Sequence, residues 1–444
     1  MFTEDSPRLA FPVDLAARVA EEWPYLVAGD YSPPPLPNST QLKELLEVAY
    51  FAGMETDEAR PLRFMLCCSR DSEQIPHREG AELIESWELS PERPFNIQEI
   101  RRIAAVTDLD SSAIWIRFSG DLSGPLMIRG LVNLGRSWSV ARNAFSYHYQ
   151  ELPHALMVRV AAPGRMTIYQ SAYRMASLTG GSLEIRAMKM AWMDMLGASG
   201  LFKEGHELLR GLITAPIHEP PKEWHEFEYL AYVNCVLAII NGMQLAGHGG
   251  ALILKSNLCN LVEPGYVRVK YGLATGGDSL RSHFVEFMNA RHKHGNMVWL
   301  SEWQRDAAPS GQEIALASIP LRDLQQKVAQ ACSFVGNLAG TDGAIIIRTD
   351  LTVEGFGAEI VLDKVKPAKA FEVDHPMQEE GLRELDTEQM GMRHRSAIRL
   401  CGTSPDLVVF VVSQDAGVSL VWSKDGAVYF KAGVTTTNMN MVFA

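Results

Sequence analysis

The first half of the chain alternates between stretches with helical spacing and stretches with strand spacing of apolar residues. A helix is expected over residues 41–51, and another after Asn96, because Asn96 followed by Glu99 is typical of a helix N-terminus. These elements, together with several strands, predict a first domain of the mixed α+β class. The expected strands are 62–67, 114–118, 126–129, 155–160 and 166–169.

The second half places longer helices between strongly apolar, β-branched runs. Such interleaving is typical of the α/β class, with a mixed central sheet flanked by helices. The expected helices are 227–245, 280–290, 321–338 and 396–401. The expected strands are 251–254, 266–271, 345–348, 358–362, 407–412, 418–422 and 428–431.

A chain of 444 residues is too long for one ordinary core, so two domains are expected. Prolines at 216, 220 and 221 interrupt the helical pattern and favour a junction there. We therefore expect an N-terminal domain over 1–213, a Pro-rich junction over 214–226 and a C-terminal domain over 227–444. A Met-rich amphipathic segment at 187–213 leads into the junction, and core packing is the favoured role of its methionines.

Composition narrows the range of partners. Hydrophobic residues form 47% of the chain and charged residues 21%, as in soluble globular proteins, and the net charge is -12. Bulk binding to nucleic acid or to anionic membrane is therefore not expected.

The apolar run 235–240 is too short to span a membrane, and the N-terminus has no secretory signal pattern, so a cytoplasmic protein is expected. The six scattered cysteines fit reduced thiols, with Cys67 and Cys68 on opposite faces of a strand.

The triplet Asp342-Gly343-Ala344 stands between a predicted long helix and a predicted apolar strand. A carboxylate at a strand edge can bind a divalent cation, and a neighbouring glycine lets a ligand approach the backbone closely. Asp-Gly is also a common turn dipeptide, and on its own the triplet favours an ordinary turn.

The triplet Arg393-His394-Arg395 stands at the predicted start of a helix. Guanidinium groups and a helix N-terminus both bind phosphate well. Positive charge at this end of a helix opposes the macrodipole, which indicates a compensating bound anion. Taken alone, a solvated basic patch explains the triplet equally well.

Together these motifs resemble bacterial diadenylate cyclase (cyclic di-AMP synthase) domains. The resemblance runs through 342–347, 391–397 and 412–414, and the strand at 250–254 resembles the early glycine-alanine strand of that family. It covers roughly the last half of the chain, and two motifs in the right order are more specific than either alone.

The resemblance implies a diadenylate cyclase fold in which two domains face each other, each holding one ATP. Each 3′-hydroxyl attacks the α-phosphate of the opposite nucleotide, giving cyclic di-AMP and pyrophosphate, so a homodimer or larger homo-oligomer is implied. Asp342 would hold Mg²⁺ or Mn²⁺ and activate the hydroxyl, Gly343 and Ala344 would lie against the nucleotide, and Leu362 would pack on the adenine. The implied phosphate-binding residues are Arg393, His394, Arg395, Ser396 and Ser413.

Three features depart from the family pattern. Met392 stands where a threonine is usual, which removes a hydroxyl beside the phosphates. Gln414 stands where many members have glutamate, and the segment between Tyr271 and Leu321 has no counterpart in the pattern. These departures bear on rate and metal preference more than on nucleotide binding.

The N-terminal domain offers no catalytic set. Residues 42–67 are similar to a presumed sensor domain of the DACNV type, which precedes some soluble diadenylate cyclases. Its His148 and His154 lack metal-ligand spacing, so structural or surface roles are favoured. His292 and His294 farther on lack it too, and a solvated helix end is expected for them.

The expected function is a diadenylate cyclase regulated by its N-terminal domain. A catalytically weak or inactive nucleotide-binding sensor with a cyclase-like fold is the main alternative, and a scaffold whose fold serves only to dimerise is a third. The chain has no Walker phosphate-binding loop, zinc-protease helix or complete dinucleotide-binding pattern.

Overall fold

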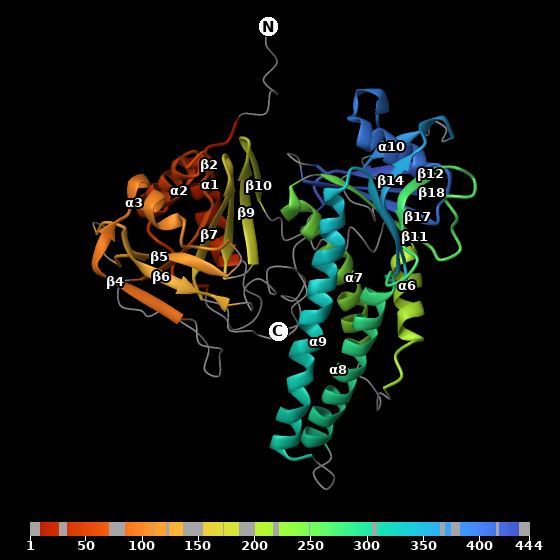
Figure 1. The fold of residues 1–444 in the computed structure, drawn as a ribbon, viewed down its shortest axis with the longest axis horizontal. Coiled ribbons are helices and arrows are strands. Elements are labelled where there is room, and N and C mark those ends of the chain that lie inside the picture. Colours follow the sequence, from red (N-terminus) through yellow and green to blue (C-terminus); the bar gives the residue numbers. More distant parts are fainter. Residues whose placement is uncertain are drawn as a thin grey trace. The chain divides into compact units, whose positions relative to one another are not determined.

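The computed structural model describes residues 9–25, 33–70, 85–109, 111–120, 124–135, 154–171, 173–185, 200–215, 222–247, 249–303, 309–364, 369–373, 382–413 and 417–434. Contacts divide the chain into two compact units, the first mainly of residues up to 189 and the second mainly of residues from 190 onward. This division lies earlier in the chain than the predicted junction at 214–226. Each unit is built around its own sheet (Figure 1).

The first unit contains an eight-stranded sheet in the order β10-β9-β8-β7-β3-β5-β6-β4 among the described residues. Strands β3 and β5 run parallel, and the other paired neighbours run antiparallel. Two further strands, β1 (Thr56–Asp57) and β2 (Arg60–Pro61), form a separate hairpin. The sheet strands are β3 (Phe64–Arg70), β4 (Glu85–Pro94), β5 (Ser112–Phe118), β6 (Met127–Asn133), β7 (Leu156–Ala162), β8 (Arg165–Gln170), β9 (Tyr173–Thr179) and β10 (Ser182–Ile185).

Three helices share one core with one face of this sheet: α1 (Pro12–Glu22), α2 (Ser39–Ala52) and α3 (Ile97–Ala104). The predicted start of α3 is confirmed, because the Asn96 side chain accepts a hydrogen bond of 2.9 Å from the backbone N–H of Glu99. Cys68 belongs to this core, whereas its neighbour Cys67 is buried in a separate cluster with Trp115. The two cysteines therefore occupy opposite faces of β3, as the strand period predicts.

In this unit the sequence pattern misses helix α1 and strands β1, β2, β4, β9 and β10. Residues along β4 are mostly exposed, at the edge of the sheet, so no alternation of apolar and polar positions marks the strand. Helix α1 follows Phe11, whose side chain cannot cap the helix, so its start is marked only by Pro12 and by Asp14, which accepts a hydrogen bond of 2.8 Å from the Phe11 N–H.

The second unit contains a mixed sheet in the order β12-β14-β13-β11-β17-β18-β19-β15-β16. Strand β11 pairs in parallel with β13 and β15 pairs in parallel with β19, while the other paired neighbours are antiparallel. The predicted mixed α/β class is confirmed. The strands are β11 (Gly250–Lys255), β12 (Val267–Gly272), β13 (Ala344–Arg348), β14 (Val353–Ile360), β15 (Ala370–Glu372), β16 (Arg383–Glu384), β17 (Leu407–Val412), β18 (Val418–Lys424) and β19 (Ala427–Lys431).

Helices lie on both faces of this second sheet. Helix α10 (Met392–Cys401) shares a core with one face, through residues such as Ile398. On the other face, Phe202 of α6 (Leu201–Arg210) packs edge-to-face on Phe410 of β17, with ring centres 6.4 Å apart. Helix α7 (Lys222–Ala246) contacts both α6 and β17. Apolar side chains of β17 point alternately to the two faces of the sheet, and helices cover both faces.

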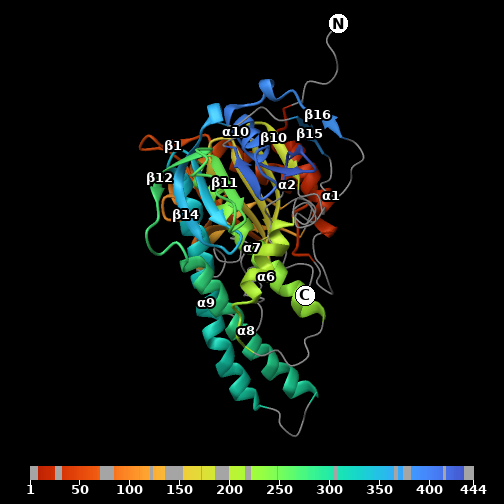
Figure 2. The same cartoon turned by 90° about the vertical axis from the view of Figure 1, so that its right-hand side faces the viewer.

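Two long helices, α8 (Ser279–Trp303) and α9 (Gly311–Asn337), run side by side away from this sheet (Figures 1 and 2). Helix α8 and the first part of α9, up to Pro320, lie in the segment between Tyr271 and Leu321 that has no counterpart in the family pattern. Ser310 and Glu313 form a capping box at the start of α9. The sequence predicts a start only at 321, because Pro320 reads as a helix boundary, but the helix continues through that proline. Within the described residues, no helix has the length and apolarity needed to cross a membrane.

A charged cluster lies buried between α6, α7 and α8. The Glu228 carboxylate, 2% exposed, lies 2.8 Å from His292 Nε2, 3.5 Å from His206 Nε2 and 3.7 Å from Arg210 Nε. Burial raises the pKa of the Glu228 carboxyl, but bonding to His206 and His292 outweighs burial and lowers that pKa to about 2. His292 is thus a buried partner of a carboxylate, and the expectation of a solvated helix end for it is wrong.

Candidate functional site at one edge of the C-terminal sheet

Both motifs from the sequence lie at the same end of the strands of the second sheet, three strands apart. In one row across the sheet, Ala344 pairs with Ala251, Ala251 with Val411, and Val411 with Ser419. Asp342 stands two residues before Ala344, at one end of this row. At the other end, His394 Nε2 lies 3.3 Å from Ser419 Oγ. Three strand spacings, about 14 Å, separate the two ends of the row.

Asp342 lies in the short connection between the 3-10 helix η3 (Leu338–Gly340) and β13. The N–H of Thr341 donates to the Leu338 carbonyl at 3.1 Å, which fixes the start of this connection. The Asp342 side chain is exposed, and no partner for its carboxylate is found among the described residues. A free carboxylate of this kind suits a hard cation such as Mg²⁺ or Mn²⁺, which commonly takes one or two protein carboxylates and completes its shell with substrate phosphates and water.

Gly343 is required by the packing of the strands themselves. Its φ is +126°, and a Cβ at this position would lie 2.6 Å from the Gly357 carbonyl carbon and 2.8 Å from the Ala358 nitrogen. The Ala344 side chain is buried in the core shared with α10. Close approach of β14, and not only of a ligand, therefore explains the glycine of this motif.

The N-terminus of α10 has no side-chain cap. Gly391 is the N-cap residue in an extended conformation, and Met392, 67% exposed, is the first helical residue. Arg393 is exposed, and no partner for its guanidinium is found among the described residues. An uncapped N-terminus with a free guanidinium beside it can bind an anion. Ser396 is turned to its own helix, since its hydroxyl donates to the Met392 carbonyl at 2.8 Å.

His394 points under the helix towards the sheet. Besides its contact with Ser419, its ring packs edge-to-face on Phe430 with ring centres 5.6 Å apart. Burial lowers the pKa of the His394 imidazole below its usual value of 6.5, so the ring is neutral at pH 7. In this position a neutral imidazole anchors α10 on β18 and β19.

Arg395 is held by a carboxylate that the sequence motifs do not include. Its Nη1 donates to Glu388 Oε2 at 3.1 Å, and Arg399 Nη2 donates to Glu388 Oε1 at 3.1 Å. Glu388 lies in the 3-10 helix η5 (Thr387–Gln389), just before α10. One carboxylate thus binds two guanidinium groups of α10, and Glu388, Arg395 and Arg399 together form a clasp between η5 and α10. An acidic residue shortly before a basic helix start is the sequence signal that could have revealed this clasp.

The remaining predicted residues lie around the same part of the unit. Ser413 follows β17, its N–H donates to the Gly417 carbonyl at 3.0 Å, and Gln414 lies outside the described residues. The preceding residue, Val412, pairs with Gly250, which places Ser413 at the edge where β13 begins. Leu362 begins the 3-10 helix η4 (Leu362–Lys364), two residues after β14.

In one chain, only some of the charged groups of the candidate site are free to bind a ligand. Among the charged residues of the two motifs, Asp342 at one end and Arg393 at the other are exposed. His394 and Arg395 are engaged with Ser419 and with Glu388. No group of three or more His, Cys, Asp or Glu side chains that could enclose a metal occurs in the described part of the chain. A cation here would rely on Asp342 and on ligands supplied by a substrate.

Residues 31–133 match a known protein family described as the probable sensor domain DACNV. The match runs from just before α2 to the end of β6, so it covers the helices and strands at the centre of the first unit. The predicted sensor-type N-terminal domain is confirmed over these residues. No curated protein matches the chain.

Proposed function

We propose that the chain is a diadenylate cyclase whose activity responds to a signal received by its N-terminal unit. The meeting of Asp342 and the N-terminus of α10 at one sheet edge is the observation that carries this proposal. The strand positions beside these two groups, Ala344 and Ser419, are three strand spacings apart, about 14 Å, which leaves room for a nucleotide between the two groups. The match of residues 31–133 to a probable sensor domain supports the signalling part of the proposal.

In this proposal each chain holds one ATP, and two chains face each other. The 3′-hydroxyl of each nucleotide attacks the α-phosphorus of the other, the bond to the bridging oxygen breaks, and pyrophosphate leaves. Asp342 accepts the hydroxyl proton and holds Mg²⁺ or Mn²⁺, which would neutralise charge on the phosphates. Arg393 and the free amides of α10 bind the triphosphate. This chemistry depends on positioning and on positive charge, and it needs no covalent nucleophile.

A nucleotide-binding sensor without turnover is the second candidate. It is favoured by the engagement of Arg395 with Glu388 and of His394 with Ser419, which leaves one free basic side chain in the Arg393-His394-Arg395 motif. Met392 supplies no hydroxyl at the position beside it. In this case ATP binds at the same edge of the sheet and acts as a regulatory ligand.

Product formation from ATP separates the two candidates. Purified full-length protein is incubated with ATP and either Mg²⁺ or Mn²⁺, and cyclic di-AMP and pyrophosphate are quantified by chromatography with mass detection. We expect one cyclic dinucleotide for every two pyrophosphates. The Asp342→Asn variant should lose activity by a factor of about 100 or more, the scale of a lost general base.

Asp425→Asn is the matched control. Asp425 lies in the turn between β18 and β19 with a φ of +51°, which asparagine tolerates, at the opposite edge of the sheet. This variant should keep full activity. ATP binding without product would favour the sensor, whereas full activity in Asp342→Asn would exclude Asp342 from the reaction. Absence of both binding and product would exclude both candidates.

A further inference from the structure

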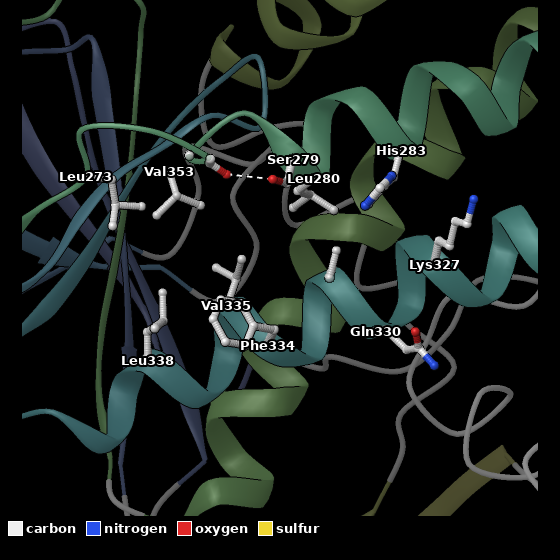
Figure 3. Close-up of a pocket in the computed structure, with 13 residues that line it drawn as sticks. Leu273, Ser279, Leu280, His283, Lys327, Gln330, Phe334, Val335, Leu338 and Val353 are labelled. Carbon is white, nitrogen blue, oxygen red and sulfur yellow. Dashed lines mark hydrogen bonds between the residues drawn. The ribbon is translucent and has the colours of Figure 1, made fainter.

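A pocket lies in the C-terminal unit, where helices α8 and α9 adjoin the sheet. Its volume is about 330 Å³, and its walls come from the connection after β12, the start of α8, the second half of α9 and the start of β14 (Figure 3). Val353, in its wall, is paired with Ile347, at the opposite end of β13 from Ala344. The wall includes neither Asp342 nor any residue of α10, although its Leu338 lies in η3, four residues before Asp342.

One end of this pocket is apolar. Leu273, Val353 and Leu338 converge there from the loop after β12, the start of β14 and the start of η3 (Figure 3). Leu280 and Val335 lie beside them and are buried. The Phe334 ring, also in the wall, is 68% exposed. Removing exposed aromatic and aliphatic surface from water is favourable, so an apolar group in this pocket would be stabilised.

The other end is positively charged. His283 of α8 and Lys327 of α9 lie there on facing helices (Figure 3). The residues of the wall include no aspartate or glutamate, although the whole chain has a net charge of -12. No acceptor for the Lys327 ammonium is found among the residues that the structure describes. A lysine that makes no ion pair within the described residues and stands beside an apolar wall favours a ligand with one negative group.

We infer that this pocket binds a small molecule with an apolar body and one carboxylate. The apolar body lies against Leu273, Leu338 and Val353, and the carboxylate pairs with Lys327, with His283 as an additional donor. The volume falls in the lower part of the range of about 300–1,000 Å³ that is typical of small-molecule sites. This inference does not depend on the proposed cyclase activity, because it uses neither Asp342 nor α10.

The test uses a pair of probes of equal shape and different charge, 4-phenylbutyrate and 4-phenylbutan-1-ol. Their affinities for the full-length protein are measured by isothermal titration calorimetry and by ligand-observed NMR. The carboxylate should bind about fivefold more tightly than the alcohol, which corresponds to one exposed ionic contact. Lys327→Met, which keeps the length of the exposed side chain, should remove this preference and leave the affinity for the alcohol unchanged.

Two further variants locate the site. Lys293→Met removes an exposed lysine of α8 that does not belong to the pocket wall and should change neither affinity. Ala331→Phe places a ring in the pocket and should abolish binding of both probes. The inference is overturned if neither probe binds the unmodified protein, if the two bind equally, or if Lys327→Met keeps the preference for the carboxylate. Retained binding in Ala331→Phe would place the probes elsewhere and would overturn it as well.

Discussion

Gly343 combines a positive φ with a neighbouring backbone that leaves no room for a side chain. We predict that Gly343→Ala lowers the free energy of unfolding by about 2 kcal/mol or more, since strain in φ and a clash with β14 act together. Urea unfolding of the full chain, followed by circular dichroism, measures the change. Gly272→Ala is the control, because a Cβ there meets nothing within 4 Å and φ is negative in β12. Equal losses in the two variants would contradict the role assigned to Gly343.

The buried Glu228 cluster makes stability depend on pH. The folded-state pKa of Glu228 is about 2, below its ordinary value of 4.5, so the folded protein binds fewer protons than the unfolded chain in this interval. The resulting stabilisation is fully present above about pH 4.5 and is lost as the pH falls towards 2. The urea midpoint of the unmodified protein should therefore decrease over this interval.

Glu228→Gln should remove this part of the pH dependence. At pH 7 the variant should be less stable by about 1–3 kcal/mol, because the buried partners lose an ionised acceptor. Glu286→Gln, at an exposed position of α8, is the matched control and should behave as the unmodified protein does. An unchanged pH profile in Glu228→Gln would show that other groups cause the effect.

The side-chain directions of the basic motif on α10 could not be predicted from the sequence. The basic motif on α10 is visible in the sequence, but the direction of each of its side chains is not. His394 and Arg395 are neighbours, yet one lies under the helix on Phe430 and the other faces Glu388. These directions follow from the rotation of about 100° per helical residue combined with the position of the sheet, which depends on residues far along the chain.

At the scale of elements, helix α10 is fixed to η5 by the clasp between Glu388 and its two arginines. If Arg395 also binds phosphate, as expected from the sequence, it must leave Glu388 to do so. We predict that Glu388→Gln increases the affinity for ATP by about threefold, since the competing carboxylate is removed. Calorimetric titration with ATP and Mg²⁺ measures this affinity.

Glu384→Gln is the comparison for this prediction. Glu384 is an exposed residue of β16 that lies 3.5 Å from Lys369, away from α10. Its replacement should leave ATP affinity unchanged. A lower affinity in Glu388→Gln would show that the clasp supports the nucleotide site and does not compete with it.

The elements themselves follow closely from the sequence where apolar period and end signals agree. Asn96 with Glu99 locates the start of α3, and the apolar runs locate β11, β13 and β17. The prediction fails where a local signal is overridden by packing. Pro320 lies within α9, whose contacts with α7 and α8 keep the helix continuous, and the polar strand β4 is held at its edge by pairing with β6.

At the scale of the whole molecule, the proposed reaction requires two chains. One chain supplies one Asp342 and one α10 start, which together serve a single nucleotide. We predict that specific activity rises with protein concentration and reaches a plateau when assembly is complete. Initial rates measured over a wide range of protein concentration, beside sedimentation velocity on the same samples, test this.

Mixing experiments provide the control. Excess Asp342→Asn protein should reduce the activity of the unmodified protein, because mixed pairs contain one inactive half. Excess Asp425→Asn protein should not. A specific activity that is independent of concentration in a monomeric protein would contradict the face-to-face arrangement.

The division into two units with separate sheets is predictable from chain length and from the change in pattern, and a sensor-type first unit is supported by the match over 31–133. The residues that meet at the candidate site are less predictable. Ser419 and Glu388 belong to no motif, and they reach the site only through strand order and through the approach of η5 to α10. The contact of Ser419 with His394 depends on strand pairing, which leaves no local trace in the sequence, whereas Glu388 stands shortly before α10 and its charge is a local signal.

The position of β11 in the middle of the second sheet has a consequence for biosynthesis. This strand leaves the ribosome well before both of its partners, β13 and β17, since they stand much later in the chain. Pairing across long sequence separations is slow and must wait for those segments. A nascent chain therefore lacks the complete candidate site until β17 and β18 have emerged, and until then its apolar β11 is without both of its neighbouring strands.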